Sequence, residues 1–283
     1  MSKPVFITAD STSDLSPELA ERFNIKIAPL HVTLGDETYL DGVEFTPEMI
    51  YERYDKDKTL PRTAAVSPQE FNAFFGPLVE QGYEVVFLAI SSELSGTYQN
   101  AVIAAQDLPG IYPVDTRKLT TGICEMLIAA CGMRDEGKDA ATIAQAMQDM
   151  IPRVNVSFVI DTLEYMWKGG RCTGVTAFGA NLLKLKPCIE MRDGKLEVCK
   201  KYRGNIFKVY EKYIEERLTG KDVDPNFIFI TTSLDLSQEV RDTIETIIRR
   251  IVPDLKELVF GRVGCTVTAH CGPGTLGLLF LEK

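Results

Sequence analysis

The chain has 283 residues, of which 45% are hydrophobic and 25% are charged. This balance is ordinary for a globular protein with a buried core and argues against extended disorder, while the length predicts one large domain or two medium lobes. The formal net charge of -9 disfavours nucleic-acid binding and limits contact with anionic membranes to a transient encounter.

The N-terminus runs from Met1 directly into a strand-like segment, without a signal-peptide core or an apolar run near the ~20 residues of a membrane span. We therefore expect a cytoplasmic protein. Seven scattered cysteines form no C-x-x-C pair, and the histidines, His31 and His270, lack zinc-motif spacing. Reduced thiols are expected, and neither a metal site nor a cofactor is expected.

The first half alternates strands with helices. The expected strands cover 5–9, 25–34, 85–90 and 111–114, and helix starts are predicted at Ser16-Pro17, Thr46-Pro47 and Ser67-Pro68, where a capping hydroxyl precedes a first-turn proline. Two further helices are expected over 122–136 and 140–150. Alternation of this kind predicts a doubly wound, mainly parallel sheet with ligand sites at the carboxyl ends of its strands.

The second half predicts a mixed sheet. Asp193-Gly194 lies between two strand-like segments, 187–191 and 196–200, and an Asp-Gly pair in that position is a strong hairpin signal. Apolar residues at helical spacing then predict two amphipathic helices, over 206–218 and 240–251. We expect an α/β protein with a first lobe over 1–151, a second over 152–283, and the ligand between them.

Two hydroxyl-rich loops follow strands of the first lobe. Ile90-Ser91-Ser92-Glu93-Leu94-Ser95-Gly96-Thr97-Tyr98 precedes a helix, whose first N–H groups and neighbouring hydroxyls could hold a carboxylate or phosphate; simple N-capping by Ser95 explains the pattern equally well. The second loop runs from Asp10 to Ser16 and should open on the same sheet edge. Its alternative explanation is that Asp10 and Asp14 satisfy turn and helix-start amides.

Two segments of the second half also carry polar groups. His270 precedes Cys271-Gly272-Pro273-Gly274 and is expected on a loop, where it could meet a ligand or be an ordinary surface or core histidine. Arg171 follows Gly169-Gly170, where a guanidinium could grip an anion or simply be solvated.

Together these segments resemble the DegV proteins, which include the FakB-type fatty-acid-binding subunits of bacterial fatty acid kinase. The resemblance covers essentially the whole chain. It rests on Asp10 to Leu15, Ile90 to Tyr98, Gly169 to Arg171, Leu185 to Pro187 with Asp193 to Lys195, and Ala269 to Gly274.

The resemblance implies a two-lobed DegV-like fold, in which a long-chain fatty acid lies in an apolar tunnel and hydroxyls and a histidine hold its carboxylate. The matching positions are Thr63, Ser95 and His270, with Ser92 and Ser11 as neighbours. It further implies a non-catalytic carrier that presents the carboxylate to a separate ATP-dependent kinase subunit for acyl-phosphate formation and phospholipid synthesis. Arg171 matches a position implicated in meeting that subunit, and its charge is expected to face the partner rather than the tunnel.

This chain departs from the family in two places, one of which is the segment from Asp115 to Gly122, which only partly follows the usual serine-, methionine- and glycine-rich form. The chain also reads Thr63-Ala64-Ala65-Val66-Ser67-Pro68 where the family often has Thr-Ser-Gln-Pro-Ser-Pro, which implies a changed tunnel lining. Two other functions remain open: an enzyme or substrate domain acting on a small phosphorylated or carbonyl compound, and a regulator that senses lipid. The absence of an evident acid–base pair or phosphate loop in the sequence favours a carrier.

Overall fold

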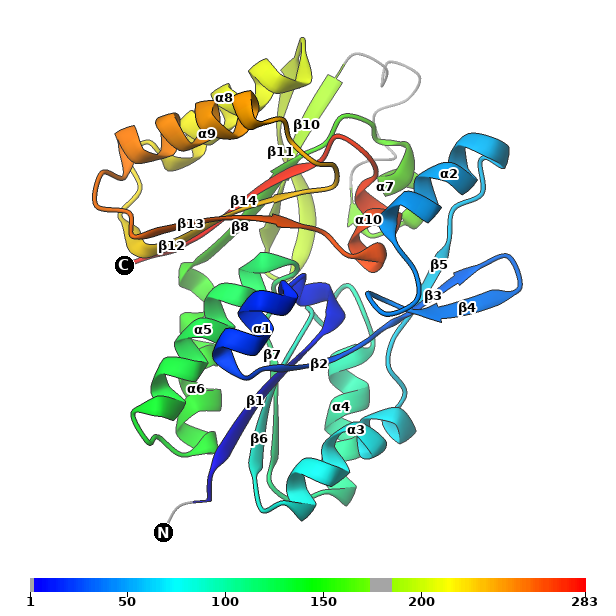
Figure 1. The fold of residues 1–283 in the computed structure, drawn as a ribbon, viewed down its shortest axis with the longest axis vertical. Helices are drawn as coiled ribbons and strands as arrows, with labels where there is room; N and C mark the ends of the chain where they lie inside the picture. Colours follow the sequence, from blue (N-terminus) through cyan, green and yellow to red (C-terminus); the bar gives the residue numbers. More distant parts are fainter. Residues whose placement is uncertain (1–2, 174–184) are drawn as a thin grey trace.

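The computed structural model describes residues 3–173 and 185–283, which form an α/β fold around three sheets (Figure 1). The four-stranded sheet has the order β2-β1-β6-β7, and every pairing in it is parallel. Its strands are β1 (Val5–Asp10), β2 (Lys26–Ala28), β6 (Glu84–Ala89) and β7 (Ile111–Asp115). The expected parallel sheet of the first half is therefore confirmed.

Helices cover both faces of this sheet, as Figure 1 shows. Along β6, Val85, Phe87 and Ala89 join a core cluster with the helices α3 (Pro68–Glu80) and α4 (Thr97–Asp107). Val86 and Leu88 point the other way, because successive strand residues alternate between faces, and pack with α5 (Thr121–Asp135) and α6 (Ala140–Met150). Both faces are buried, which explains the continuous apolar run of this strand.

The predicted helix starts are present, with one difference in capping. Ser16 caps α1 (Pro17–Phe23), and Ser67 forms a full capping box with Glu70 at the start of α3. Thr46 precedes α2 (Pro47–Asp57) in extended conformation but makes no side-chain cap bond. The proline at the first helical position thus marks all three starts more reliably than the hydroxyl does.

One expected strand, over 25–34, is two strands in different sheets. β2 ends at Ala28, and β3 (His31–Leu34) belongs to a three-stranded antiparallel sheet with β4 (Glu37–Leu40) and β5 (Arg62–Ala64). Pro29 lies at the break, and a proline lacks the N–H that a continued ladder would require. This small sheet was not predicted, and it matters because β5 carries Thr63.

The second half contains a seven-stranded mixed sheet, of order β13-β12-β14-β8-β10-β11-β9. The predicted hairpin joins β10 and β11, and its turn residues Asp193 and Gly194 both have positive φ, at 46° and 80°, as a type I′ turn requires. The strands are β8 (Val154–Val159), β9 (Cys172–Thr173), β10 (Leu185–Arg192), β11 (Lys195–Arg203), β12 (Val223–Thr232), β13 (Glu257–Arg262) and β14 (Leu276–Glu282).

The two predicted amphipathic helices, α8 (Ile206–Leu218) and α9 (Gln238–Ile251), cover one face of this sheet and share a core cluster with it. On the other face lies α5, which also contacts β1 and β6 of the parallel sheet. A Cβ on Gly122 of α5 would lie only 2.3 Å from Val156 Cγ2 of β8, so the absence of a side chain permits this close approach. Because α5 packs on both sheets, the division at 151 and 152 stays a prediction.

Candidate functional site

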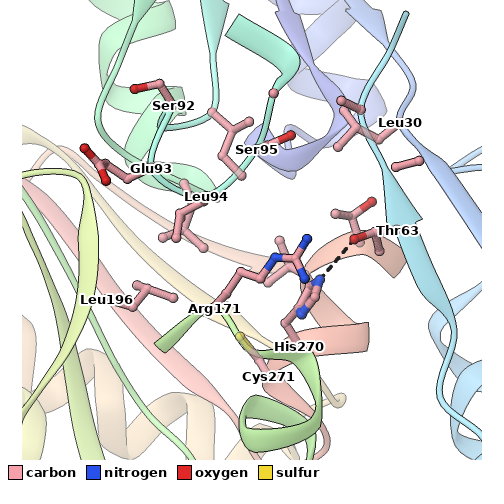
Figure 2. Close-up of a pocket in the computed structure, with 17 residues that line it drawn as sticks. Leu30, Thr63, Ser92, Glu93, Leu94, Ser95, Arg171, Leu196, His270 and Cys271 are labelled. Carbon is pink, nitrogen blue, oxygen red and sulfur yellow. Dashed lines mark hydrogen bonds between the residues drawn. The ribbon is translucent and has the colours of Figure 1, made fainter. Parts of the chain in front are cut away.

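A cavity of about 360 Å³ lies where loops of the two larger sheets meet β5 and a short helix, α10 (Cys265–Cys271) (Figure 2). Polar and apolar side chains share its wall: Thr63, Arg171 and His270 lie close together at one end, whereas Ser92 and Glu93 lie apart from them. The lining residues are Leu30, Thr63, Ala64, Ala65, Ile90, Ser92, Glu93, Leu94, Ser95, Gly96, Leu119, Arg171, Leu196, Thr266, Val267, His270 and Cys271.

His270 lies on α10, so its expected position on a loop was wrong. The N-terminus of α10 is held by carboxylates distant in the sequence. Asp14 Oδ1 accepts a hydrogen bond from the Gly264 N–H at 2.7 Å, and Asp41 Oδ1 accepts one from the Cys265 N–H at 2.8 Å. Such contacts satisfy orphan N–H groups of the first turn, but a local sequence pattern does not reveal them.

Thr63 and His270 meet inside the cavity. Thr63 Oγ1 and His270 Nε2 are 3.1 Å apart, and Figure 2 draws this hydrogen bond. Behind the ring lies Gly169, the last residue of α7 (Glu164–Gly169): a Cβ built there would be 2.3 Å from His270 Nδ1. The glycine allows α7 and α10 to pack closely, so that the backbone fixes the imidazole from one side.

His270 is neutral at pH 7. Burial lowers its pKa to about 4, and the positive charge of Arg171 adds to this effect. No described residue offers a hydrogen-bond partner to Nδ1. A neutral imidazole has one donor nitrogen and one acceptor nitrogen, so His270 can donate one hydrogen bond to an anion without carrying charge.

Ser95 and Ser92 both line the cavity, but their hydroxyls have different surroundings. Ser95 Oγ lies 2.9 Å from Thr97 Oγ1 and accepts a long bond of 3.3 Å from the Thr97 N–H, but the N-cap of α4 is Gly96, without a side-chain cap bond, so Ser95 does not have the N-capping role considered for it. Ser92 donates to Asp115 Oδ2 at 2.6 Å, and in Figure 2 it lies apart from the Thr63–His270 pair. Ser95 is therefore the better placed of the two for a ligand.

The structure does not bring Ser11 to the cavity wall. Its hydroxyl donates to Asp41 Oδ2 at 2.9 Å and accepts from the Leu30 N–H at 3.0 Å. The neighbouring carboxylates do satisfy backbone amides: Asp10 accepts bonds from the Thr12 N–H in its own turn and from the distant Ile90 N–H, and Asp14 accepts one at the start of α10. We correct the expectation that Ser11 neighbours the ligand: the Asp10–Ser16 loop supports the site from outside.

Arg171 lines the cavity, contrary to the expectation that its charge faces away from the tunnel. It is exposed, its guanidinium donates to the Gly169 carbonyl at 2.9 Å, and Figure 2 places it beside His270. The Gly169-Gly170 pair turns the chain back, since Gly170 has a φ of +66°, and thereby aims Arg171 at the cavity. A partner can still reach this exposed side chain.

Sequence reasoning missed Thr266, whose buried Oγ1 has no hydrogen-bond partner among the described residues. It precedes His270 by four positions on α10, so both project from one helix face. The only available signal was the four-residue spacing, and this has meaning only once the segment is known to be helical. Ala64 and Ala65 also line the cavity and extend its apolar part.

Within residues 3–173 and 185–283, no cluster of three or more His, Cys, Asp or Glu side chains has a geometry that could hold a metal ion. In the same ranges, no helix is both long and apolar enough to traverse a bilayer.

Comparisons with known proteins agree on the family. The DegV family, described as uncharacterised, matches residues 4–283. A DegV domain-containing protein of Clostridium acetobutylicum is 30% identical over 281 residues, 98% of each chain. A fatty-acid-binding DegV protein of Thermus thermophilus superposes with a TM-score of 0.86 at 29% identity, covering all of both chains. Linoleic-acid-loaded fatty acid kinase B3 of Streptococcus pneumoniae shares the fold, with a TM-score of 0.83 at 17% identity over all of both chains. The chain described here belongs to the DegV family.

Proposed function

We propose that this chain is a carrier that holds one long-chain fatty acid in the cavity and presents its carboxylate to a separate ATP-dependent kinase subunit for acyl-phosphate formation. The Thr63–His270 contact at one end of the cavity, next to apolar side chains of its wall, is the observation that carries the proposal. The fatty-acid-binding relative from Thermus thermophilus, similar over its whole length, supports the same ligand class.

The carboxylate would lie between Thr63, Ser95 and His270. A buried carboxylate without hydrogen bonds is costly, and hydroxyls together with a neutral imidazole offset much of that cost. Thr266, with its unpartnered hydroxyl, is a further donor within the same wall. Arg171 adds a positive charge at this end, which favours an anion over a neutral ligand.

The acyl chain would lie along Leu30, Ile90, Leu94, Leu119 and Leu196. A volume of about 360 Å³ falls within the ~300–1,000 Å³ usual for small-molecule sites. Apolar walls favour a hydrocarbon over the small phosphorylated or carbonyl compound of the alternative enzyme hypothesis. A small polar ligand would leave these walls without a partner.

The kinase half of the proposal follows from where the carboxylate would lie. Arg171 is exposed and lines the same end of the cavity, so a partner that contacts it also reaches the ligand's reactive group. The polar end offers hydroxyls and one neutral histidine of low pKa, a set suited to holding an anion rather than to acid–base chemistry. Phosphoryl transfer is accordingly assigned to the partner.

Extractive mass spectrometry of the purified full chain tests the ligand, and acyl-phosphate formation with candidate kinase subunits tests the transfer. We expect one long-chain fatty acid per chain and ATP-dependent product only when both proteins are present. A bound phosphorylated or carbonyl metabolite would support the enzyme alternative. Bound fatty acid without transfer to any kinase subunit would support the lipid-sensing alternative.

A further inference from the structure

Two cysteines of the β10–β11 hairpin lie side by side. The pairing runs from Cys188 opposite Lys200 to Ile189 opposite Val198, so Cys199 is the extra residue of a β-bulge. Its thiol donates a hydrogen bond to the Cys188 carbonyl oxygen, with the Sγ 3.4 Å from that oxygen. The bulge thus places a second thiol against the thiol of the opposite strand.

This arrangement suits a disulfide. Cys188 opposes Lys200, the chain neighbour of Cys199, and the Cys199 Sγ already lies within 3.4 Å of the Cys188 carbonyl oxygen. Disulfides usually join Cα atoms about 4.4–6.8 Å apart, a span close to the distance between neighbouring strands. A bond between Cys188 and Cys199 therefore needs no separation or sliding of the strands. The hairpin is fixed at its tip as well, where Gly194 accepts a hydrogen bond from Ser91 at 2.8 Å.

The two thiols differ in access. Of the seven cysteines, all within the described ranges, Cys199 is the exposed one, and Cys188 is fully buried among core residues that include Tyr213 and Leu278. Contact with the Cys188 thiol lowers the pKa of Cys199, with a contribution from the positive charge of Arg217, while burial and Glu190 oppose this shift. The same contact, together with burial, raises the pKa of Cys188. An exposed thiol that ionises readily beside a buried one is typical of an attacking and a resolving cysteine.

We propose that Cys188 and Cys199 form a reversible dithiol–disulfide pair that exchanges with low-molecular-weight disulfides such as glutathione disulfide. The Cys199 thiolate attacks one sulfur of the reagent, its S–S bond breaks, and one reagent thiolate leaves. Cys188 then attacks the Cys199 sulfur, releasing the second reagent thiolate, and the Cys188 proton passes to that leaving group. The protein loses two hydrogens and two electrons, and one reagent disulfide becomes two thiols.

The second step becomes easier once the first has occurred. Converting Cys199 into a mixed disulfide removes its negative charge, and with it the interaction that holds the proton on Cys188. Arg217 favours a Cys188 thiolate, whereas burial and Glu190, the ion-pair partner of Arg217 at 2.7 Å, still oppose it. The mixed disulfide should therefore be short-lived in the wild-type chain.

The experiment treats the full chain with glutathione disulfide, blocks remaining thiols with iodoacetamide and maps peptides by mass spectrometry. We expect an intramolecular Cys188–Cys199 bond that dithiothreitol reverses. Cys188→Ala should accumulate the Cys199–glutathione adduct, whereas Cys199→Ala should lose nearly all reaction. Cys131→Ala, which removes a buried thiol outside the hairpin, should react as the wild type does.

A stable glutathione adduct on wild-type Cys199, no reaction at this residue, or a bond to any other cysteine would overturn the proposal. The wild-type time course keeps the test valid if Cys188→Ala folds poorly, because the adduct must form first and then decay as the disulfide appears. A wild-type adduct that never decays is then the contrary result. Fatty-acid binding plays no part in either measurement.

Discussion

Thr63 Oγ1 and His270 Nε2 lie 3.1 Å apart across 207 residues of sequence. The contact joins β5 of the small antiparallel sheet to α10, which follows the last-but-one strand of the mixed sheet. It brings a hydroxyl and a neutral imidazole to one end of the cavity, where both can turn toward an anion. The proposed carboxylate site depends on this pair more than on any other.

Replacing His270 by alanine should weaken fatty-acid binding about tenfold or more. A hydrogen bond to a charged group is worth about 1.5–3 kcal/mol, and 1.4 kcal/mol corresponds to a factor of ten. Calorimetry with the delipidated chain measures the affinity. His31→Ala is the matched control, because His31 pairs with Glu70 outside the cavity lining. Equal affinities for the two variants would contradict the assignment.

The low pKa of His270 predicts a pH-dependent stability of the delipidated chain. Its pKa is about 4 in the folded chain and about 6.5 when unfolded, so between these values the unfolded chain binds more protons. The stability that neutral His270 contributes is full above about pH 6.5 and is lost as the pH falls toward 4. Asp10, whose pKa burial raises to about 6, acts in the opposite direction: its contribution is full at low pH and is lost as the pH rises through 6.

Comparison with His270→Gln separates the contribution of His270 to the pH dependence of stability from the contributions of opposing groups such as Asp10. Between pH 7 and pH 5, the free energy of unfolding of the wild type should fall by about 1–2 kcal/mol relative to this variant, since one pKa unit is worth ~1.4 kcal/mol. Urea unfolding at the two pH values measures the difference. If the difference in unfolding free energy between the wild type and His270→Gln is the same at both pH values, His270 titrates at its ordinary pKa.

Gly169→Ala should disturb the site without touching the ligand directly. The new methyl group would lie 2.3 Å from His270 Nδ1, so the ring or α7 must move. We expect weaker fatty-acid binding and a shifted imidazole resonance in NMR spectra. Gly76→Ala is the control: nothing lies within 4 Å of a Cβ there, and the exchange in mid-helix should be neutral or stabilising by about 0.5–1 kcal/mol.

Asp41→Ala should lower stability and fatty-acid affinity together. Asp41 accepts hydrogen bonds from the Cys265 and Thr266 N–H groups and from Ser11, and thereby fixes the helix that carries His270. Loss of a helix cap costs about 0.5–2 kcal/mol. Asp139→Ala removes the exposed cap of α6 and should lower stability but leave affinity unchanged. Denaturation and calorimetry of both variants separate the two effects.

Much of this fold could be predicted because its signals are local. Serine or threonine before proline marks helix starts, and Asp193-Gly194 specifies its hairpin through backbone conformation alone. The division of residues 25–34 was missed, although Pro29 is a local signal for it. The strands on either side each have ordinary strand composition, so the pattern alone did not separate them.

The site was harder to predict because its supports are distant in the sequence. α10 is a helix whose first turn is satisfied by Asp14 and Asp41, which lie 250 and 224 residues away from their partners. Without knowledge of those caps, the sequence around His270 predicts a loop rather than a helix. Likewise, the role of Gly169 could be recognised only from its close approach to the imidazole of His270. That of Thr266 could be recognised only from the helix face that it shares with His270.

Arg171→Ala should separate binding from transfer. Arg171 is exposed, so its attraction to a bound carboxylate is screened by water and worth about 0.2–1 kcal/mol, which predicts at most a few-fold loss of affinity. Removing its charge should also raise the pKa of His270. At saturating fatty acid, acyl-phosphate formation with the kinase subunit should still fall strongly, because a partner would meet this guanidinium at the cavity. Lys168→Ala controls for loss of a nearby positive charge, since Lys168 pairs with Glu164 and lies outside the cavity lining. If saturating fatty acid restores transfer by Arg171→Ala to the wild-type rate, the residue serves the ligand alone and the partner role is wrong.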